Sequence, residues 1–543
     1  MTGSTACARV VVEELISYGV RDVVLAPGSR NAPLAYELFE ADKIGLLRLH
    51  VRIDERSAAF TALGLAKGSA TPVPVITTSG TAAGNLHPAV MEAWHSRVPL
   101  IAITADRPVT MINTGANQTT RQQGLFAGHV RAEVQLSSDD ASPRAWRFQL
   151  NRALVACSGL RSLVSGPVHI NIGLSEPLIP EDVAAVEEDY REVGPAAAEP
   201  LITELPGGPQ TVIIAGDLAP HDGTAVAGIA ERAGVPLLAE PSSNARGGRT
   251  AISSYRLLLQ SSLVDDIERV IVVGHATLSR PVTRLLGRQD IELIIVDPSP
   301  EWNDPTMNAD RVIAGFVLSD SGPDEWLGRW QQADRAIRPL ITGVTDDDAV
   351  ITGPALAELV WRSLGTDDLL FVGSSSPVRD LDLADRSATP PVTYANRGLA
   401  GIDGSVSTAI GLALAADQPA HALLGDLTFL HDSNGLIIGP TEPRPKLRII
   451  VADDDGGSIF ATLEQGHPAQ MRAFERLFGT PHHADLAGLA SSVSADYTKI
   501  TELDDLRPIL AKPPQALEVI DVQVDRDHRR TMNERLNSLA ATL

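Results

Sequence analysis

The sequence predicts an α/β protein of several domains, in which each domain is a mainly parallel sheet flanked by helices. Short apolar runs alternate with amphipathic stretches almost throughout the chain, and this alternation is the pattern of βα units. Many of the apolar runs end in Gly, Ser, Thr or Asp. Because 543 residues exceed what one core accommodates, we expect roughly three or four domains.

Three blocks of predicted strands follow one another along the chain. An acidic stretch rich in Pro and Ala at 177–209 and a polar stretch at 339–354 separate them, and we interpret both as linkers. The predicted domains are 1–185, 186–345 and 346–543. The clearest strand candidates are 21–29, 73–80, 98–107 and 167–173 in the first block, 211–216, 234–239, 269–274 and 292–297 in the second, and 421–427 and 447–457 in the third.

The first and third blocks resemble each other. Asp54-Glu55 precedes an Ala/Gly/Leu-rich helical stretch and then a strand that ends at 78–81, and Asp403-Gly404 precedes a similar stretch and a strand that ends at 425–427. The offset between them stays near 347 residues. Such helices often match by chance, but together with the domain count the match predicts two homologous sheets flanking a different middle one.

The composition of the chain indicates its cellular compartment and argues against some classes of binding partner. No apolar run reaches the roughly 18 residues that a membrane span needs, and residues 1–20 have the pattern of a capped amphipathic helix rather than of a signal peptide. Cys7 and Cys157 are too few for a disulfide framework or a structural zinc site. We expect a soluble, cytoplasmic protein. The net charge of −23 argues against nucleic acid or an anionic membrane as partner.

The strongest functional signal lies in the third block. Gly425-Asp426-Leu427 closes one apolar run, and Asp453 to Asp455, followed by Gly456-Gly457, closes the next. The carboxyl ends of parallel strands form the edge where ligands bind, and Mg²⁺ takes one or two protein carboxylates besides phosphate and water. Aspartates are also common in plain turns. Two clusters at neighbouring strand ends, with glycines that let a ligand approach the backbone, favour a diphosphate–metal anchor.

Glu55 is a candidate acid–base residue, because it stands where an apolar strand meets a helix. Acidic residues are common in a first helical turn, where they interact favourably with the helix dipole, so the position alone is weak evidence. In an apolar pocket, however, a carboxyl group has a raised pKa and can exchange protons near neutral pH.

Several arginines occur at predicted strand ends or in Gly-rich segments. In an acidic chain most arginines are surface counter-charges, but a group of them at strand ends fits capture of a substrate with more than one carboxylate, since guanidinium binds carboxylate bidentately. A polar loop, TGANQTTRQQG, adds two amides. These candidates are Arg30, Arg107, Arg280, Arg379, Arg397, Asn117 and Gln118.

Other enzyme motifs are absent from the sequence. There is no G-x-G-x-x-G after a strand, no G-x-x-x-x-G-K-[ST] and no G-x-S-x-G, which disfavours a dinucleotide-binding fold, a P-loop NTPase and an α/β-hydrolase. We expect His482-His483 to be an exposed pair.

With these residues identified, the chain resembles thiamine-diphosphate enzymes, whose motif is G-D-x, an interval of about 28 residues and an Asn/Asp cluster before glycine. The three blocks resemble the pyruvate-oxidase-like branch, with pyrimidine-binding, central and diphosphate-binding domains. Within it, the strings APGSRNAPL, TSGTAAGNL, TADRP with TGANQ, NRGLAGIDG with STAIG, and GDLTFLHDSNGL are similar to those of the 2-succinyl-5-enolpyruvyl-6-hydroxy-3-cyclohexene-1-carboxylate synthases of menaquinone biosynthesis. The match covers both outer blocks, but in the middle only TLSRPV fits.

The resemblance implies a role for each candidate residue. Asp426, Asp454 and the backbone carbonyl of Gly456 would hold Mg²⁺, or Mn²⁺, on the diphosphate. Glu55 would contact the aminopyrimidine ring nitrogen and promote the imino tautomer. Further cofactor contacts would be Ser79, Gly80, Ser375, Ile402, Gly425 and Leu427. Arg379 and Arg397 would meet 2-oxoglutarate, and isochorismate would be received by Ser29, Arg30, Arg107, Asn117, Gln118 and Arg280, with Ile459, Phe460 and Leu463 as an apolar wall.

The implied reaction is decarboxylation of 2-oxoglutarate followed by Stetter-type conjugate addition of the succinyl carbanion to isochorismate. In this branch the pyrimidine-binding block of one chain serves the diphosphate-binding block of another, which implies a homodimer or a homotetramer. Two positions depart from the wider thiamine motif. Leu427 replaces its usual glycine, and Asp453 to Asp455 stand where asparagines are usual, so metal preference and a share of Asp453 in the metal site stay open.

The sequence leaves two alternative functions open. Another thiamine-diphosphate enzyme, such as a 2-oxoacid decarboxylase or an acetolactate synthase, would turn over a monoanionic 2-oxoacid alone. A non-catalytic α/β binding protein would have a degenerate cofactor site, and an intact Glu55 beside an intact Asp426 counts against it.

Overall fold

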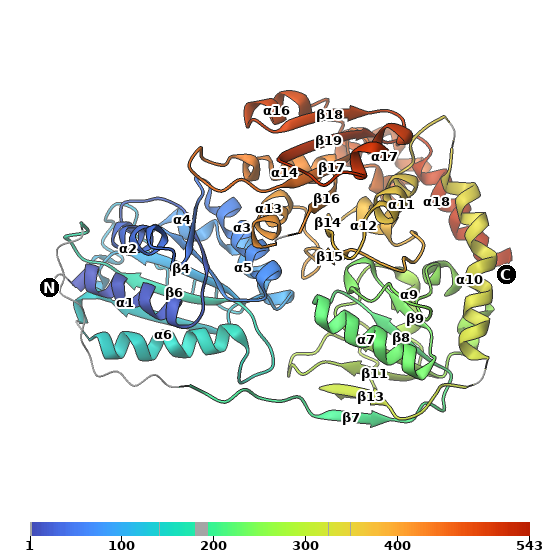
Figure 1. Ribbon diagram of the computed structural model, residues 1–543, viewed down its shortest axis with the longest axis horizontal. Helices are drawn as coiled ribbons and strands as arrows, with labels where there is room; N and C mark the ends of the chain where they lie inside the picture. Colours follow the sequence, from blue (N-terminus) through green and yellow to red (C-terminus); the bar gives the residue numbers. More distant parts are fainter. Residues whose placement is uncertain are drawn as a thin grey trace. The chain divides into compact units, whose positions relative to one another are not determined.

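The computed structural model describes residues 3–140, 142–179, 194–323, 325–347, 349–416 and 418–542. Parallel sheets with helices on their faces make up the fold (Figure 1), which confirms the expected α/β class. The chain forms two compact units. The first unit consists of Met1–Glu199, Asp403–Asp417 and His431–Pro445, and the second of Pro200–Ile402, Gln418–Leu430 and Lys446–Leu543. No helix among the described residues is both long and apolar enough to cross a bilayer.

The first unit contains a six-stranded sheet of order β2-β1-β3-β4-β6-β5, in which all neighbours are parallel. Alternate strand residues face opposite ways, so one face packs against α1, α2 and α6 and the other against α3 and α5. The strands are β1 (Asp22–Leu25), β2 (Arg48–Val51), β3 (Val73–Thr77), β4 (Leu100–Asp106), β5 (Ala132–Ser137) and β6 (Val168–Gly173). The helices are α1 (Gly3–Ser17), α2 (Ala32–Lys43), α3 (Glu55–Ser69), α4 (Thr81–Gly84), α5 (His87–His95) and α6 (Pro143–Ser158).

The middle block forms a five-stranded parallel sheet of order β12-β11-β10-β8-β9 and a separate two-stranded sheet of β13 and β7. Its strands are β7 (Ile202–Leu205), β8 (Thr211–Ala215), β9 (Leu237–Ala239), β10 (Arg269–Val273), β11 (Glu292–Val296), β12 (Arg311–Ile313) and β13 (Gly315–Leu318). Its helices are α7 (Pro220–Ala233), α8 (Tyr255–Leu258), α9 (Arg280–Leu286) and α10 (Trp326–Thr345).

The last block forms a six-stranded parallel sheet of order β15-β14-β16-β17-β19-β18. Its strands are β14 (Leu369–Val372), β15 (Val392–Tyr394), β16 (Ala420–Gly425), β17 (Leu447–Asp453), β18 (Asp496–Ile500) and β19 (Leu517–Gln523). Its helices are α11 (Gly353–Ser363), α12 (Ser376–Leu381), α13 (Ser405–Ala415), α14 (Asp426–His431), α15 (Met471–Phe474), α16 (Leu486–Ser492), α17 (Leu503–Leu510) and α18 (Arg529–Ser538). Every strand candidate taken from the sequence overlaps one of the observed strands.

Both predicted linkers are shorter than expected. Within 177–209, β7 pairs in parallel with β13, so the end of this stretch is a strand; residues 180–193, which include the predicted boundary at 185, lie outside the described residues. Within 339–354, α10 continues to Thr345 although Pro339 lies inside it, and α11 begins at Gly353 with Thr352 as its N-cap. Amphipathic packing of α10, whose Ile337 and Ile341 are buried, outweighs the proline. The two boundaries between the three predicted domains stay a prediction.

The two outer sheets have the same topology. When the strands of each are numbered in chain order, both have the order 2-1-3-4-6-5. The first residues of β1 and β14, of β3 and β16, and of β4 and β17 are separated by the same 347 residues. The two outer sheets therefore share one topology, as the predicted repeat requires.

Helices α3 and α13 occupy equivalent places in this repeat and pack against each other within the first unit. A Cβ atom on Gly64 would lie 2.1 Å from the carbonyl oxygen of Thr408, and one on Gly411 would lie 2.1 Å from that of Thr61. The two contacts mirror each other, because the repeat offset relates Gly64 to Gly411 and Thr61 to Thr408. Only glycine allows the two backbones to approach this closely.

Candidate active site

A cavity of about 120 Å³ lies at the carboxyl ends of β16 and β17, in the second unit. This is the edge at which parallel sheets bind ligands. Strand β16 leads directly into α14, and a tight turn follows β17. The cavity brings together many of the residues predicted from the sequence: Ser375, Ile402, Gly425, Asp426, Leu427, Asp454, Gly456, Ile459 and Phe460.

The turn after β17 depends on its glycine. Gly456 has φ +144, and a Cβ atom there would lie 2.0 Å from the carbonyl oxygen of Gly479. Asp455 just before it has φ 52. The backbone N–H of Gly456 donates to Oδ2 of Asp426 at 2.7 Å, so the turn is tied to the neighbouring strand end. The Gly-Gly pair thus fixes the turn through close packing.

Asp426 is buried and Asp454 is half-buried, and the two carboxylates lie within electrostatic reach of each other. Burial, and then the charge of Asp454, together raise the pKa of Asp426 to about 7, although hydrogen bonds from His482 and from the N–H groups of Gly456 and Leu427 act to lower it. Burial likewise raises the pKa of Asp454 to about 6. Two such groups of like charge are stabilised when a cation lies beside them.

The donor atoms fit a divalent cation. Oδ1 of Asp454 is buried and has no hydrogen-bond partner among the described residues, while its other oxygen accepts from the Ser458 hydroxyl. One oxygen each of Asp426 and Asp453 and a ring nitrogen of His482 lie within 4.8 Å of one another. Carboxylate oxygens at a diphosphate site are the ligands that Mg²⁺ and Mn²⁺ prefer.

His482 is not part of an exposed pair, so that expectation is wrong for this residue; His483 is exposed. The side chain of His482 is only 15% exposed, and its Nε2 lies 3.0 Å from Oδ2 of Asp426. Its Nδ1 accepts the N–H of Ala484 at 2.9 Å, so in the neutral ring Nε2 carries the proton and donates to the carboxylate. No local pattern in the sequence connects positions 56 residues apart.

Arg529 lines the cavity and was not suggested by the sequence. It forms a bidentate pair with Asp380, with distances of 2.9 and 2.6 Å, and both residues line the cavity. The charge of Arg529 acts on Asp454. The basic run DRDHRR near the C-terminus of an acidic chain was the available signal.

Four predicted residues of the second unit lie outside this cavity's lining. Arg379, on α12, donates to the carbonyl of Ser375 at 2.7 Å. Burial and then the charge of Arg397 lower its pKa, so the two guanidinium groups are near each other. Arg280 is exposed at the start of α9, and Leu463 is half-buried after a 3₁₀ turn.

In the first unit, a second set of predicted residues comes together at the carboxyl ends of β3 and β4. The Ser79 hydroxyl donates to the carbonyl of Gln118 at 2.8 Å, and Arg107 donates to the carbonyl of Asn117 at 2.9 Å. Arg107 also lies 3.4 Å from the Ser79 hydroxyl. The backbone N–H of Gly80 donates to Oε1 of Gln122 at 2.9 Å. Gln122 is fully buried, and the sequence did not suggest it.

Arg30 joins this set. Burial lowers its pKa, and so does the charge of Arg107, which shows that two cationic groups are held near each other. Arg30 donates to the carbonyl of Leu174 at 2.9 Å, and its neighbour Ser29 is exposed. Adjacent guanidinium groups of this kind favour an anionic ligand.

Glu55 is the first residue of α3, and Asp54 caps that helix by accepting the N–H of Ser57 at 2.8 Å. The Glu55 carboxyl is half-buried and accepts a hydrogen bond from Nδ2 of Asn85 at 3.1 Å. A carboxyl held by one amide at a helix start is oriented and still reachable by a ligand.

Comparison with known proteins agrees with this geometry. Residues 5–125 match the model of the family described as "Thiamine pyrophosphate enzyme, N-terminal TPP binding domain". The chain is similar to the 2-succinyl-5-enolpyruvyl-6-hydroxy-3-cyclohexene-1-carboxylate synthase of Nocardioides sp., with 44% identity over 99% of this chain and 98% of that protein. The synthase of Kineococcus radiotolerans is 43% identical over 99% of this chain and 98% of that protein. The synthase of Paenarthrobacter aurescens is 43% identical over 98% of this chain and 96% of that protein.

The similarity thus extends through the middle block, where the sequence motifs were weak. It covers both sets of predicted residues, in chains of nearly equal length. The chain therefore belongs to the 2-succinyl-5-enolpyruvyl-6-hydroxy-3-cyclohexene-1-carboxylate synthase family of thiamine-diphosphate enzymes.

Proposed function

We propose that the chain decarboxylates 2-oxoglutarate and adds the succinyl group to isochorismate in a Stetter-type conjugate addition, giving 2-succinyl-5-enolpyruvyl-6-hydroxy-3-cyclohexene-1-carboxylate and CO₂ for menaquinone biosynthesis. The observation that carries this proposal is the pair of carboxylates with raised pKa values, Asp426 and Asp454, at a cavity lined by the residues expected around a diphosphate. Relatives that carry this synthase name along nearly the whole chain add support.

In this proposal Asp426, Asp454 and the backbone carbonyl of Gly456 hold a divalent cation, Mg²⁺ or Mn²⁺, on the diphosphate. The unpartnered Oδ1 of Asp454 supports its role as a ligand. Both oxygens of Asp453 accept hydrogen bonds, from the N–H of Asp455 and from Gln523. Although one oxygen of Asp453 lies within 4.8 Å of donor atoms of Asp426 and His482, we therefore assign Asp453 to support of the turn rather than to the cation.

When bound, thiamine diphosphate supplies an electron sink for the carbanion that decarboxylation leaves. Glu55 exchanges a proton with the aminopyrimidine ring nitrogen, and Asn85 orients its carboxyl group. Ser79 and Gly80 lie by the same ring, whereas Ser375, Gly425 and Leu427 lie by the diphosphate. Ile402 props the cofactor in its bent shape.

The arginines receive the substrates. Both substrates carry two carboxylates, and in a chain of net charge −23 they need local positive charge. Arg379 and Arg397 serve 2-oxoglutarate. Isochorismate is received by Ser29, Arg30, Arg107, Asn117, Gln118 and Arg280, with Ile459, Phe460 and Leu463 as an apolar wall. We further infer a cytoplasmic homodimer or homotetramer that contains the domains 1–185, 186–345 and 346–543.

The proposal is tested by incubating the protein with thiamine diphosphate, Mg²⁺ and 2-oxoglutarate, with and without isochorismate, while CO₂ and the conjugate product are measured. We expect isochorismate to accelerate CO₂ release and the product to appear in equal amount. CO₂ release that does not respond to isochorismate would identify a different decarboxylating enzyme. A titration without saturable cofactor binding would leave only a binding protein.

A further inference from the structure

Arg397 is held by the middle block. It follows β15, and only 3% of its surface is exposed. Its Nη2 donates to the Thr277 hydroxyl at 2.8 Å, whereas the contact of Nη1 with the Ser374 hydroxyl is longer, at 3.5 Å. The shorter hydrogen bond therefore comes from the loop after β10, and it joins residues 120 positions apart in the sequence.

The Thr277 loop is in turn anchored by a buried carboxyl group. Glu240 follows β9 and is 1% exposed. Its Oε1 accepts the backbone N–H of Leu278 at 2.8 Å, one residue after Thr277. Burial raises the pKa of Glu240 to about 8, and the charge of Arg397 acts to lower it, so the carboxyl lies within electrostatic reach of that guanidinium. A chain of contacts thus runs from Glu240 through the loop to Arg397.

Arg379 is held in a parallel way. Arg256, which lies on α8, donates to the backbone carbonyl of Arg379 at 3.1 Å. Asp382, at the end of α12, is fully buried and accepts the Tyr255 hydroxyl at 2.6 Å. The same carboxylate pairs with Arg246 at 3.6 Å and with Arg256 at 3.7 Å. The middle block therefore contacts both segments that carry the predicted 2-oxoglutarate arginines.

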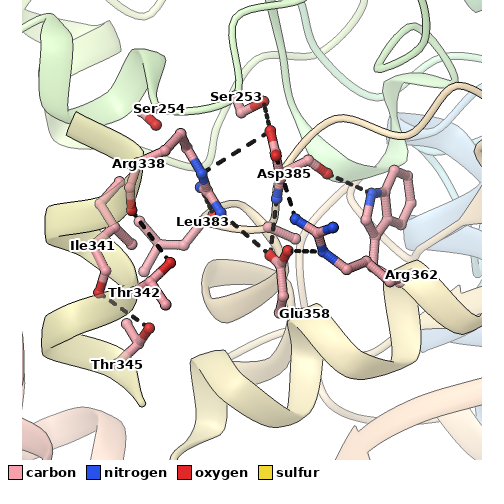
Figure 2. Close-up of polar contacts among 12 residues, drawn as sticks. Ser253, Ser254, Arg338, Ile341, Thr342, Thr345, Glu358, Arg362, Leu383 and Asp385 are labelled. Atoms are coloured by element: carbon pink, nitrogen blue, oxygen red, sulfur yellow. Dashed lines mark hydrogen bonds and ion pairs between the residues drawn. The ribbon is translucent and has the colours of Figure 1, made fainter. Parts of the chain in front are cut away.

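The segment that follows α12 is fixed as well (Figure 2). The Ser253 hydroxyl donates to Oδ1 of Asp385 at 2.9 Å, and the N–H of Asp385 donates to Glu358 at 2.9 Å. Arg338, on α10, donates to the carbonyl of Leu383 at 2.5 Å. These bonds tie the segment after α12 to α10, α11 and the segment around Ser253.

We propose that Thr277 and Glu240 are positioning residues for Arg397, and that through them the middle block sets the geometry with which 2-oxoglutarate is bound. The inference rests on the proposed function, since that function assigns Arg397 to this substrate. Thr277 acts directly, because its hydroxyl fixes one end of the guanidinium plane. Glu240 acts one step further away, because it fixes the backbone on which Thr277 stands.

A purely structural role for the same contacts makes a different prediction. If they only joined two parts of the fold, losing the Thr277 hydroxyl would lower stability and leave the affinity for 2-oxoglutarate unchanged. Thr277 is exposed, so its side chain contributes little to a core. Its substitution can therefore be made without a large cavity or overpacking cost.

The test compares Thr277→Val, which removes the hydroxyl at constant shape, with Thr277→Ser, which keeps it. We expect Thr277→Val to raise the KM for 2-oxoglutarate about tenfold, the order for one lost hydrogen bond to a charged group, with kcat and the KM for isochorismate changing much less. Thr277→Ser should stay within about twofold of wild type. Calorimetric titration with 2-oxoglutarate repeats the comparison without turnover, and thermal unfolding checks that the fold is intact.

Glu240 is tested in the same way. Glu240→Gln keeps an acceptor for the N–H of Leu278 and should bind 2-oxoglutarate nearly as tightly as the wild type. Glu240→Ala removes this acceptor and should bind 2-oxoglutarate more weakly. Equal 2-oxoglutarate affinity in wild type, Thr277→Val and Thr277→Ser would overturn the proposal, and so would equal losses in the Val and Ser variants. A wild-type protein that binds 2-oxoglutarate but forms no product with isochorismate would instead contradict the proposed function.

Discussion

The three adjacent aspartates after β17 have different partners. Asp453 accepts the N–H of Asp455 at 3.0 Å and Nε2 of Gln523 at 2.7 Å. Oδ1 of Asp454 is buried and has no hydrogen-bond partner in the part of the chain that the structure describes. Asp455 accepts the N–H groups of His482 and His483 at 3.1 and 2.8 Å. Asp453 thus supports the turn, Asp455 ties down the loop that contains His482, and Asp454 is the one that we propose as a ligand of the cation.

This division predicts different effects of neutralising each carboxylate. Asp454→Asn should weaken Mn²⁺ binding in the presence of thiamine diphosphate about tenfold or more, because it removes a charge beside the cation. Asp453→Asn is the matched control and should have a clearly smaller effect. Electron paramagnetic resonance of free Mn²⁺ measures both affinities. A larger loss in the Asp453 variant would assign that residue to the cation instead.

Glu55→Gln should abolish turnover while the cofactor still binds. The amide keeps the shape of the side chain and its contact with Asn85, but it cannot exchange a proton. We expect a loss of at least about a hundredfold in kcat, with cofactor affinity by fluorescence titration within a few-fold of wild type. Glu40→Gln, on the exposed face of α2, is the control. Near-normal activity in the Glu55 variant would refute this role.

Glu240 should also make stability depend on pH. Its pKa is raised from the ordinary value of 4.5 to about 8, chiefly by burial, so the folded state holds this proton more tightly than the unfolded chain does. The contribution of this proton binding to the stability of the folded state is fully present below about pH 4.5 and is lost as the pH rises to about 8. The midpoint of thermal unfolding of the wild type should therefore fall over this pH range relative to that of Glu240→Gln. A difference between the two proteins that does not vary with pH would contradict the prediction.

At the scale of elements, the contact of α3 with α13 is the most sensitive to added volume. Gly411→Ala would place its Cβ 2.1 Å from a backbone oxygen that cannot move away locally, so the helices must separate. We expect the unfolding midpoint to fall by several degrees, as for other overpacked contacts. Gly328→Ala is the control: it is exposed on α10 with no atom near its Cβ position, and it should be neutral or slightly stabilising. Equal midpoints in the two variants would show that the helices adjust.

At the scale of the whole molecule, the proposed homodimer can be tested by mixing two inactive proteins. If each site takes Glu55 from one chain and Asp426 from another, a mixed dimer of Glu55→Gln and Asp426→Ala chains has one intact site and one doubly altered site. When equal amounts of the two variants exchange chains fully, random pairing makes about half of the dimers mixed. Because each mixed dimer has one intact site of two, about a quarter of the wild-type activity per chain should be recovered. Sedimentation would show whether exchange occurred. Exchange without recovered activity would place both residues of a site in the same chain.

The strands, their ends and the repeat of the outer sheets were predictable from the sequence, because these features depend on local residue patterns. The strands from 73–80 and 98–107 and the two acidic strand ends at 425–427 and 453–457 were identified by apolar runs that close on turn residues. The repeat offset correctly predicted two sheets of one topology. The extents of the linkers were missed, since β7 forms only by pairing with a strand more than a hundred residues later, and no local pattern carries that information.

The sequence by itself determined that this chain has parallel sheets and where many of their strands end, and its resemblance to a known family predicted Glu55, Asp426 and Asp454 as residues of a thiamine-diphosphate site. Only the tertiary structure decided which aspartate has an unpartnered oxygen, that His482 donates to Asp426, and that Arg397 is held through Thr277. The reason is physical. Strand and helix patterns arise from residues a few positions apart, whereas hydrogen-bond partners at a sheet edge are set by which distant segments the packing brings to that edge.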